Sequence, residues 1–333
     1  MSSSRFFNAG LGAAVVALAS FAQPAAGQQA VNFGTSSVGS VFYVISIAMG
    51  KMIGKHAGIN VSVQPVGGSY PNLFALADGK VDFAMANSLS MANRFQGKPP
   101  FKEAYPVRIV AQGQPNYRVI LVRPAAKITR ISDFEGKTLI GKRPALPELE
   151  QIADAFFKVH KLNRGKIKII STVNTGQVVK VMKAGTVDAA LYPAALRQPA
   201  LTQLFQDNAA RFFDLPEKSR DEMLKHLPDS FWPGMFKKGS FPGQERDAYA
   251  FGLHSSWVTR ANLPEDVVYR SIKAVLGNPK EFSTFHAAAR QWTPEQSLAH
   301  FSVPFHPGAV RYFKEVGAWT AEHEAMQAKL IKG

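Results

Sequence analysis

The sequence contains no cysteine, and this absence removes several kinds of chemistry at once. In a chain of 333 residues without Cys, a disulfide scaffold, a thiol nucleophile, a thiolate zinc site and an iron–sulfur cluster are all excluded. Charged residues are also scarce, at 19% against 46% hydrophobic residues. This balance supplies enough apolar material for a buried core, so the chain is not intrinsically disordered. Its length suits one large or two medium domains.

The motifs of common hydrolases are absent as well. The sequence has neither G-x-S-x-G nor H-E-x-x-H. Its eight histidines are spread out, with His300 and His306 the closest pair, so we expect no metal site. Glu148 and Glu150 could form a carboxylate pair, although the dipole of a helix N-terminus favours acidic residues in any case. We therefore expect a protein that is not an enzyme and carries no cofactor.

The strongest bias in composition is positive charge. Lys and Arg number 39 against 24 Asp and Glu, which gives a formal net charge of +15. Such a charge favours nucleic acid, a membrane surface or small anions as partners. The densest basic stretch, residues 158–168, carries no recognisable nucleic-acid-binding motif. We therefore expect no nucleic acid as a partner, and the simplest interpretation is a basic soluble protein whose charge helps to gather anionic solutes.

Residues 1–27 are typical of a secretory signal peptide. Arg5 precedes a run without charge over residues 9–22, which is too short to span a bilayer and is followed by small residues. The alternative, a buried core helix, is disfavoured because Gln23 and Pro24 follow at once. No later stretch is long and apolar enough to span a membrane. We therefore expect export of the protein and removal of residues 1–27; the resemblance described below implies that its destination is the periplasm.

The remaining chain alternates predicted strands and helices. Residues 30–34, 60–66 and 81–86 read as strands, separated by helices over 41–55 and 71–77. This βαβαβ order indicates a parallel sheet covered by helices. A second set of such units begins near Tyr117, with the following predicted elements: strands at 117–122, 138–140, 166–173 and 187–191, and helices at 149–160 and 177–183.

The two sets indicate two lobes. Residues 79–84 (GKVDFA) and 185–190 (GTVDAA) share four of six residues, although many joints between a helix and a strand would look alike. Residues 233–243 read as a loop, 248–259 as a strand, and a helical region after Pro307 is expected to pack back on the first lobe. We therefore predict lobe 1 at 28–116 and 246–333, and lobe 2 at 117–245.

A loop rich in hydroxyl groups joins the first strand to the first helix. Thr35, Ser36 and Ser37 lie in the segment GTSSVGS, which lacks the third glycine of a dinucleotide fingerprint and the lysine of a P-loop. Hydroxyl groups at a helix N-terminus form a natural anion site, because free N–H groups and the positive end of the dipole lie there. The alternative is an ordinary helix cap.

Other polar residues follow neighbouring strands. Ser69, Asn72 and Asn87 belong to the first lobe, and Arg143 and Tyr192 follow strands of the second. Ligands of open α/β sheets bind beyond the carboxyl ends of the strands, so we expect these residues to share one cleft. Arg143 could hold a carboxylate through two parallel hydrogen bonds, although a solvated loop is the alternative for both Lys142 and Arg143.

These motifs resemble the TAXI-type solute-binding proteins of tripartite ATP-independent periplasmic (TRAP) transporters. The resemblance rests on six segments in the family's order: GTSSVGSVFY at 34–43, GGSYPN at 67–72, LADGKVD at 76–82, DFEGK at 133–137, FPGQ at 241–244 and HPGAVRYFKE at 306–315. Together they span nearly the whole chain after the predicted signal.

The resemblance implies an α/β, two-lobed periplasmic binding protein, type II-like, with a ligand cleft between the lobes. It implies a monomer that binds a carboxylate such as glutamate or a dicarboxylic acid and delivers it to membrane-embedded TRAP subunits. By position, it implies these ligand-binding residues: Thr35, Ser36, Ser37, Tyr43, Ser69, Asn72 and Asn87. The second-lobe loop GKRPALP at 141–147 departs from the family's glycine- and hydroxyl-rich pattern, and Arg143 could replace the lost donors.

Two other functions remain open. One is a binding protein of an ATP-driven (ABC) importer for sulfonate-like or related solutes, because its lobes would look alike. The other is an enzyme that uses the same fold, which would need a nucleophile or an acid–base pair in the cleft.

Overall fold

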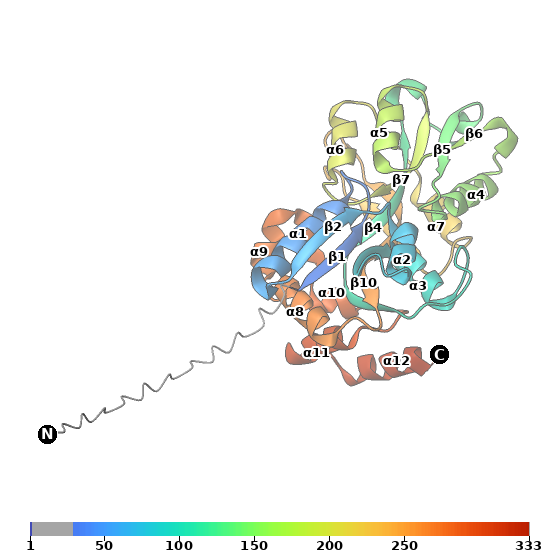
Figure 1. The fold of residues 1–333 in the computed structure, drawn as a ribbon. Helices are drawn as coiled ribbons and strands as arrows, with labels where there is room; N and C mark the ends of the chain where they lie inside the picture. Colours follow the sequence, from blue (N-terminus) through green and yellow to red (C-terminus); the bar gives the residue numbers. More distant parts are fainter. Residues whose placement is uncertain (2–28, 333) are drawn as a thin grey trace.

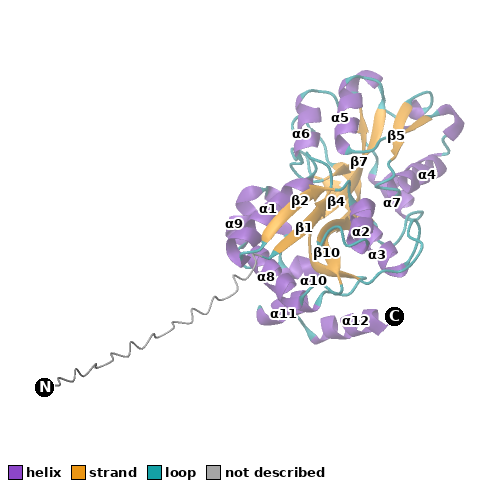
Figure 2. Ribbon diagram, in the orientation of Figure 1, coloured by secondary structure: helices purple, strands orange, loops and turns teal. Residues whose placement is uncertain are grey.

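The computed structural model describes Met1 and residues 29–332, so the predicted signal peptide lies almost wholly outside the described residues. Figure 1 shows two parts that are joined by long strands, and Figure 2 shows helices packed around a central sheet in each. The chain thus has a mixed α/β fold, as the alternation of elements predicts.

The first part is built on the predicted βαβαβ unit. Its elements are β1 (Ala30–Thr35), α1 (Val41–Ala57), β2 (Asn60–Pro65), α2 (Ser69–Ala77), β3 (Phe83–Asn87) and α3 (Ser88–Gln96). Strand β1 pairs in parallel with both β2 and β3, with Phe33 opposite Val63 on one side and Phe83 on the other. The predicted parallel sheet is confirmed.

The second part repeats this arrangement with its own parallel strands. Its main elements are β5 (Thr138–Lys142), α4 (Glu148–His160), β6 (Lys168–Ser171), α5 (Thr175–Lys183), β7 (Ala189–Ala194), α6 (Pro199–Gln206), β8 (Arg211–Phe212) and α7 (Glu217–Leu224). Single 3-10 turns lie at Pro124–Ala126, Ile131–Phe134 and Arg164–Lys166. Strand β5 pairs in parallel with β6 and β7.

Two long antiparallel strands connect the parts into one sheet. Strands β4 (Val107–Val122) and β10 (Ala248–Arg260) lie side by side, and the sheet order is β2-β1-β3-β10-β4-β7-β5-β6. One end of β10 pairs with β3 of the first part, and β4 pairs with β7 of the second. Both polypeptide crossings between the parts are therefore strands of a shared sheet.

The sequence prediction of these crossings was incomplete. The predicted strand at 117–122 is only the second half of β4, because Gly113 and Pro115 resemble a strand end. Pro115 lies opposite His254, where the register with β10 shifts, so the strand continues past it.

The predicted loop over residues 233–243 was wrong in its first four residues, which belong to β9 (Trp232–Phe236). This strand pairs with β10, and proline is tolerated on an edge strand. Gly234 is needed there because a Cβ at that position would lie 2.3 Å from the ring of Tyr117.

The C-terminal segment packs back on the first part, as expected. It consists of α8 (Glu265–Leu276), α9 (Pro279–Phe285), a 3-10 turn at Ala287–Gln291, α10 (Pro294–Leu298), α11 (Pro307–Glu315) and α12 (Ala321–Lys332). Phe305 and Phe313 are fully buried in the core of the first part, and Phe305 forms a parallel bridge with Ile109 of β4.

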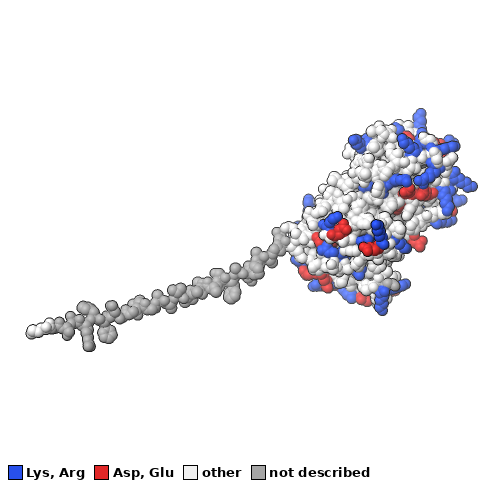
Figure 3. All heavy atoms as spheres, turned by 45° about the vertical axis from the view of Figure 1, so that its right-hand side comes forward, with Lys and Arg blue, Asp and Glu red and all other residues white. Residues whose placement is uncertain are grey.

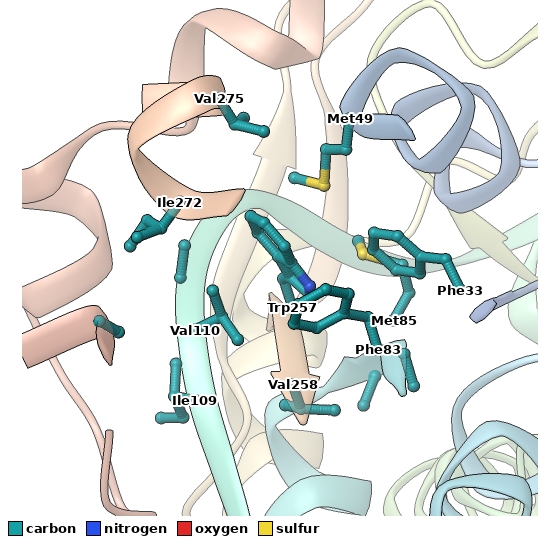
Figure 4. Close-up of a cluster of buried hydrophobic side chains, with 14 of the residues drawn as sticks. Phe33, Met49, Phe83, Met85, Ile109, Val110, Trp257, Val258, Ile272 and Val275 are labelled. Atoms are coloured by element: carbon teal, nitrogen blue, oxygen red, sulfur yellow. The ribbon is translucent and has the colours of Figure 1, made fainter. Parts of the chain in front are cut away.

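The hydrophobic clusters follow the two parts. One cluster gathers residues from 31–111 and 257–313 together with Ala195. Two others gather residues of the second part on the two faces of its sheet, and one of these also includes Leu89 of α3. Trp257 on β10 is completely buried at the centre of the first cluster, with its ring 5.8 Å from that of Phe33 and 5.1 Å from that of Phe83 (Figure 4). The boundaries predicted at 116/117 and 245/246 stay a prediction.

Replacing Trp257 by Ala should destabilise the first part strongly. The substitution removes a large ring from a packed core and leaves a cavity, for which we expect a loss of about 3–5 kcal/mol in the free energy of unfolding. Urea denaturation measures this. The control is Val38→Ala, at an exposed position, where we expect a change within about 0.5 kcal/mol. Equal effects of the two substitutions would contradict this account of the core.

The histidine of the HPGAVRYFKE segment should make stability depend on pH. His306 is buried and caps α11: its Nδ1 accepts a hydrogen bond from the backbone N–H of Gly308, and its Nε2 lies 2.9 Å from the carbonyl oxygen of Leu263. Burial lowers the pKa of His306 from 6.5 to about 4. The unfolded chain therefore binds a proton at a higher pH than the folded chain, and stability falls as the pH drops below 6.5.

Replacement of this side chain by Asn, which can still cap a helix, should remove that dependence. Between pH 7 and about pH 4.5, we expect the free energy of unfolding to fall by about 2–3 kcal/mol more in the unmodified chain than in His306→Asn. Urea denaturation at the two pH values gives both numbers. An identical fall in the two proteins would show that His306 does not titrate as described.

Candidate functional site

The loops after the parallel strands of the two parts face one another. The guanidinium of Arg143, after β5, donates through Nη2 to the carbonyl oxygen of Gly67, after β2, at 3.1 Å. The backbone N–H of Thr175 lies 3.4 Å from the hydroxyl oxygen of Ser37. A third contact joins the N–H of Ala200 to the carbonyl oxygen of Gly39 at 3.3 Å. The carboxyl ends of both sets of strands therefore meet across one cleft.

A narrow cavity lies between these loops. Its volume is about 30 Å³, and it is lined by Ser36, Ser40, Val41, Phe42, Gly68, Ser69, Asn116, Arg118, Arg143, Leu146, Thr175, Pro193 and Gln198. Pockets that hold organic ligands usually measure about 300 Å³ or more. A solute of several heavy atoms can therefore enter only if the two sets of loops move apart.

Arg118, which lines the cavity, forms a buried ion pair with Glu148 behind it. Arg118 on β4 and Glu148 at the start of α4 are both fully buried. Glu148 Oε1 accepts hydrogen bonds from Arg118 Nε at 3.1 Å, from Arg118 Nη2 at 2.5 Å and from Asn87 Nδ2 at 3.0 Å. Because Asn87 ends β3, this cluster joins both parts of the chain through one carboxylate.

Arg143 is a second buried cation. Its side chain is 3% exposed and donates to Thr175 Oγ1 at 3.3 Å and to the carbonyl of Gly67. Neither partner is charged. Burial, and secondarily the nearby Arg118, lower the pKa of Arg143 to about 10. The cleft thus holds two arginines against Glu148, which leaves one positive charge without a carboxylate partner among these residues.

The N-terminus of α2 adds to this positive potential. Gly67 and Gly68 precede it with φ values of 135° and 128°, a backbone region that favours glycine. Gly68 occupies the N-cap position and offers no side-chain cap, unlike Ser40 at the start of α1. The first N–H groups of α2 therefore remain available to an anion beside Arg143.

Three of the predicted site residues line the cavity: Ser36, Ser69 and Arg143. Ser37 lies at its edge, in contact with Thr175. Thr35 lies behind it and is fully buried, with its hydroxyl oxygen accepting from Ser46 at 3.0 Å. The capping role at α1 belongs to Ser40, so these predicted hydroxyls are not used as its cap.

The other predicted residues serve the surrounding framework in this structure. Asn72 donates to the carbonyl oxygens of Gly34 and Met85 and so ties α2 to β1 and β3. Asn87 caps α3 and donates to Glu148. Tyr43 is half-buried and does not line the cavity. Their binding roles stay predictions.

Tyr192 lies directly behind the second-lobe wall. It is fully buried, and its hydroxyl oxygen accepts a hydrogen bond from Gln198 Nε2 at 3.2 Å. Burial raises its pKa well above the ordinary range. Gln198 lines the cavity, so this hydrogen bond connects Tyr192 to the cavity wall, and the binding role of Tyr192 stays a prediction.

The structure decides between a solvated loop and a place in the cleft for each of the charged loop residues. Lys142 is partly exposed and pairs with Glu150, so the solvated interpretation holds for it. Arg143 is buried in the cleft, so that interpretation does not hold for Arg143. Glu148 and Glu150 do not act as a carboxylate pair, because each has its own cation.

Sequence reasoning missed several lining residues, including Arg118, Asn116, Thr175 and Gln198. Arg118 stands in the predicted strand YRVILV, where one charged residue among apolar ones is a usable signal of a buried ionic partner. Thr175 begins α5 and Gln198 precedes α6. These two positions become recognisable only when the loops are placed in space.

Removing the charge of Glu148 should destabilise the protein, because Arg118 would remain buried without a counter-charge. For Glu148→Gln we expect a loss of about 3 kcal/mol or more in the free energy of unfolding by urea denaturation, and recovery of most of it in the double variant Arg118→Met/Glu148→Leu. The control Glu150→Gln removes an exposed pair and should cost about 1 kcal/mol or less. Equal costs for Glu148→Gln and Glu150→Gln would contradict the assignment.

Within residues 29–332, no group of three or more acidic, His or Cys side chains is arranged to hold a metal ion. No helix of that range has both the length and the apolar character needed to cross a membrane.

Several solved structures have a similar fold. MatC from Rhodopseudomonas palustris with bound malate is 10% identical, with a TM-score of 0.56 over 90% of this chain and 98% of that one. Rpa4515 from R. palustris with adipate is 15% identical, with a TM-score of 0.53 over 92% of this chain and 96% of that one. A structure described as a periplasmic transporter is 14% identical, with a TM-score of 0.50 over 92% of this chain and 98% of that one.

These likenesses show that the predicted fold is correct: the chain has the α/β architecture of two-lobed periplasmic solute-binding proteins. The two parts described above are its lobes, and the cavity beside Arg143 lies in the cleft between them. A model of the NMT1-like family matches residues 33–317, which is most of the sequence, and the chain therefore belongs to the NMT1-like family.

Proposed function

We propose that this protein captures a small organic anion, a carboxylate such as glutamate or a dicarboxylic acid, and delivers it to a membrane transporter. The observation that carries the proposal is Arg143, a buried cation without a carboxylate partner in the cleft between the lobes. A buried charge is costly unless it is paired, so a carboxylate in the cleft would stabilise the closed arrangement of the lobes. Malate and adipate in the similar structures support this class of solute.

The binding step follows from the contacts across the cleft. Separation of the lobes about β4 and β10 would release Arg143 from the carbonyl of Gly67 and admit the solute. A carboxylate would then take that place and accept hydrogen bonds from the guanidinium and from the first N–H groups of α2. Charge-assisted hydrogen bonds of this kind contribute about 1.5–3 kcal/mol each.

The surrounding residues would set the shape of the site. We propose direct contact for Ser36, Ser69 and Arg143, and positioning roles for Asn72, Asn87 and Tyr192 through the bonds described above. Ser37 would contact the solute at the edge of the cleft, whereas Thr35 and Tyr43 would support the loop and helix that carry the lining residues. No reaction on the solute is proposed, because Glu148 is held by Arg118 and Asn87.

We propose that the protein is exported, acts as a monomer in the periplasm and delivers its solute to TRAP-type membrane subunits, as the TAXI-like segments suggest. Delivery to an ABC importer is the second candidate, because the fold is common to both kinds of system. A neighbouring gene for a multi-span permease without an ATPase would support the first; an adjacent ATPase gene would support the second.

Carboxylates should stabilise the protein against heat. For a ligand present at 100 times its dissociation constant, linkage gives about 2.7 kcal/mol of added stability. We expect an increase in Tm with at least one of malate, adipate and glutamate in a thermal-shift assay, followed by calorimetric titration. A response to a neutral solute and to none of the acids would contradict the proposal.

Arg143 should dominate the affinity for that acid. For Arg143→Gln we expect at least about tenfold weaker binding, because one charge-assisted hydrogen bond or more is lost. The matched control is Lys142→Gln, the adjacent cation, which is solvated and paired with Glu150 and should bind as the unmodified chain does. A melting curve without ligand checks that both variants are folded. Unchanged affinity in Arg143→Gln would remove this residue from the site.

A further inference from the structure

A second and much larger cavity lies elsewhere in the molecule. Its volume is about 860 Å³, which is within the range of ligand pockets. Its walls come from three regions: α3 with β4 and β10, the segment that leads into β9, and the C-terminal segment. The lining residues are Ser88, Met91, Gln112, Pro115, Asp229, Ser230, Trp232, His254, Gln296, Leu298, Ala299, His300, Phe301, Ser302, Glu322, His323 and Met326.

This cavity and the cleft lie on opposite faces of β4. Pro115 lines the large cavity, whereas the next residue, Asn116, lines the cleft. Successive side chains of a strand point to opposite faces of the sheet. His254, which lies opposite Pro115 on β10, also faces the large cavity. The two crossing strands therefore separate the two cavities.

The walls of the large cavity come from both lobes. Asp229, Ser230 and Trp232 come from the second lobe, and Met91 and Met326 come from the first. If the lobes rotate about β4 and β10, the space between them becomes narrower on one face of the sheet and wider on the other. The small volume of the cleft and the large volume of this cavity fit that relation.

The walls of the cavity suit a flat apolar group. Trp232, Phe301, Met91 and Leu298 supply aromatic, thioether and aliphatic surface, and the His254 ring lies 5.6 Å from that of Trp232. Burial lowers the pKa of His254, so its ring stays neutral near pH 7. Met326 remains 43% exposed at the mouth. Aromatic faces of this kind attract cations as well as apolar rings.

The lining of the cavity contains carboxylates but no Lys or Arg, in a chain of net charge +15. The carboxylates are Asp229 and Glu322, and they line it together with three histidines, His254, His300 and His323. Neither carboxylate forms an ion pair with a residue of the described range 29–332. On the face shown in Figure 3, by contrast, basic and acidic side chains are intermixed. An anion would be repelled here, and an organic cation attracted.

We propose that the large cavity is a second ligand site for an organic cation with an aromatic body, and that its occupation favours closure of the opposite cleft. The aromatic walls would hold the ring, and Asp229 and Glu322 would hold the positive charge. The existence of this site does not depend on the proposed carboxylate function, whereas its effect on the cleft rests on that function.

Benzyltrimethylammonium is a suitable probe, and phenylacetate is its anionic counterpart with the same ring. Calorimetric titration or saturation-transfer NMR on the full chain should show saturable binding of the cation and weaker or no binding of the anion. The double variant Asp229→Asn/Glu322→Gln should weaken cation binding about fivefold or more, given about 0.5–1 kcal/mol per exposed charge. Glu245→Gln, an exposed carboxylate outside the cavity, is the control and should leave binding unchanged.

A steric variant tests the location independently. Ala299 is exposed at the cavity wall, so Ala299→Trp should fill the space and abolish binding without disturbing the core. No saturable binding of the cation to the unmodified chain, equal binding of phenylacetate, or binding unaffected by both variants would overturn the site.

The coupling is tested by titrating the best carboxylate in the presence of saturating benzyltrimethylammonium. Linkage requires a tighter apparent affinity for the acid, and an equal gain in affinity for the cation when the acid is present. If neither ligand changes the affinity for the other, the coupling is contradicted, and the second site itself is not. Failure of every acid to bind would refute the carboxylate function, and the direct cation titration would still decide the second site.

Discussion

The structure depends on one buried carboxylate shared between the lobes. Glu148 at the start of α4 receives Arg118 from the crossing strand β4 and Asn87 from the end of β3. Buried charges are tolerated only when they are paired and hydrogen-bonded. The cluster therefore holds the end of β3 against the start of α4 in this structure. Because Glu148 compensates Arg118, the neighbouring Arg143 is left without a carboxylate partner among these cleft residues.

The crossing strands β4 and β10 also determine where the two cavities lie. A sheet that runs through both lobes has two faces, and each face carries its own cavity with its own sign of charge. The cleft combines Arg143 with the uncapped start of α2, whereas the opposite cavity combines aromatic surface with two carboxylates. Motion about β4 and β10 would therefore act on both cavities, which is why the proposed coupling is placed at these two strands.

Local sequence patterns predicted the α/β class and the two sets of parallel units, whereas the two-lobed binding-protein fold was implied by the resemblance to TAXI-type proteins. Apolar runs, glycine stops and hydroxyl loops depend on neighbouring residues, so both parallel units and the meeting of their loops at one cleft could be predicted from them. Strand β9 was missed because proline and glycine at 233 and 234 normally break strands, and only the ring of Tyr117 explains the glycine. The length of β4 was missed for a similar reason at Gly113 and Pro115.

The details of the site were less predictable because they depend on distant contacts. Ser36, Ser69 and Arg143 were recognisable as loop residues beside helix starts. Arg118 and Glu148 lie 30 residues apart in the sequence, and the residues around each of them do not predict that they pair. The same limit applies to Asn87, whose amide is bound to Glu148, and to Tyr192, which reaches the cleft only through Gln198.

The central claim, that a carboxylate is trapped between two lobes, is tested most directly by a distance between them. Since the chain has no cysteine, Lys51→Cys on α1 and Lys180→Cys on α5 would carry the only spin labels, on exposed positions of opposite lobes. Electron–electron double resonance should show a longer or broader distance distribution without solute, and a shorter, narrower one with the acid that stabilises the protein. A distribution that stays the same when that acid is bound would contradict the account.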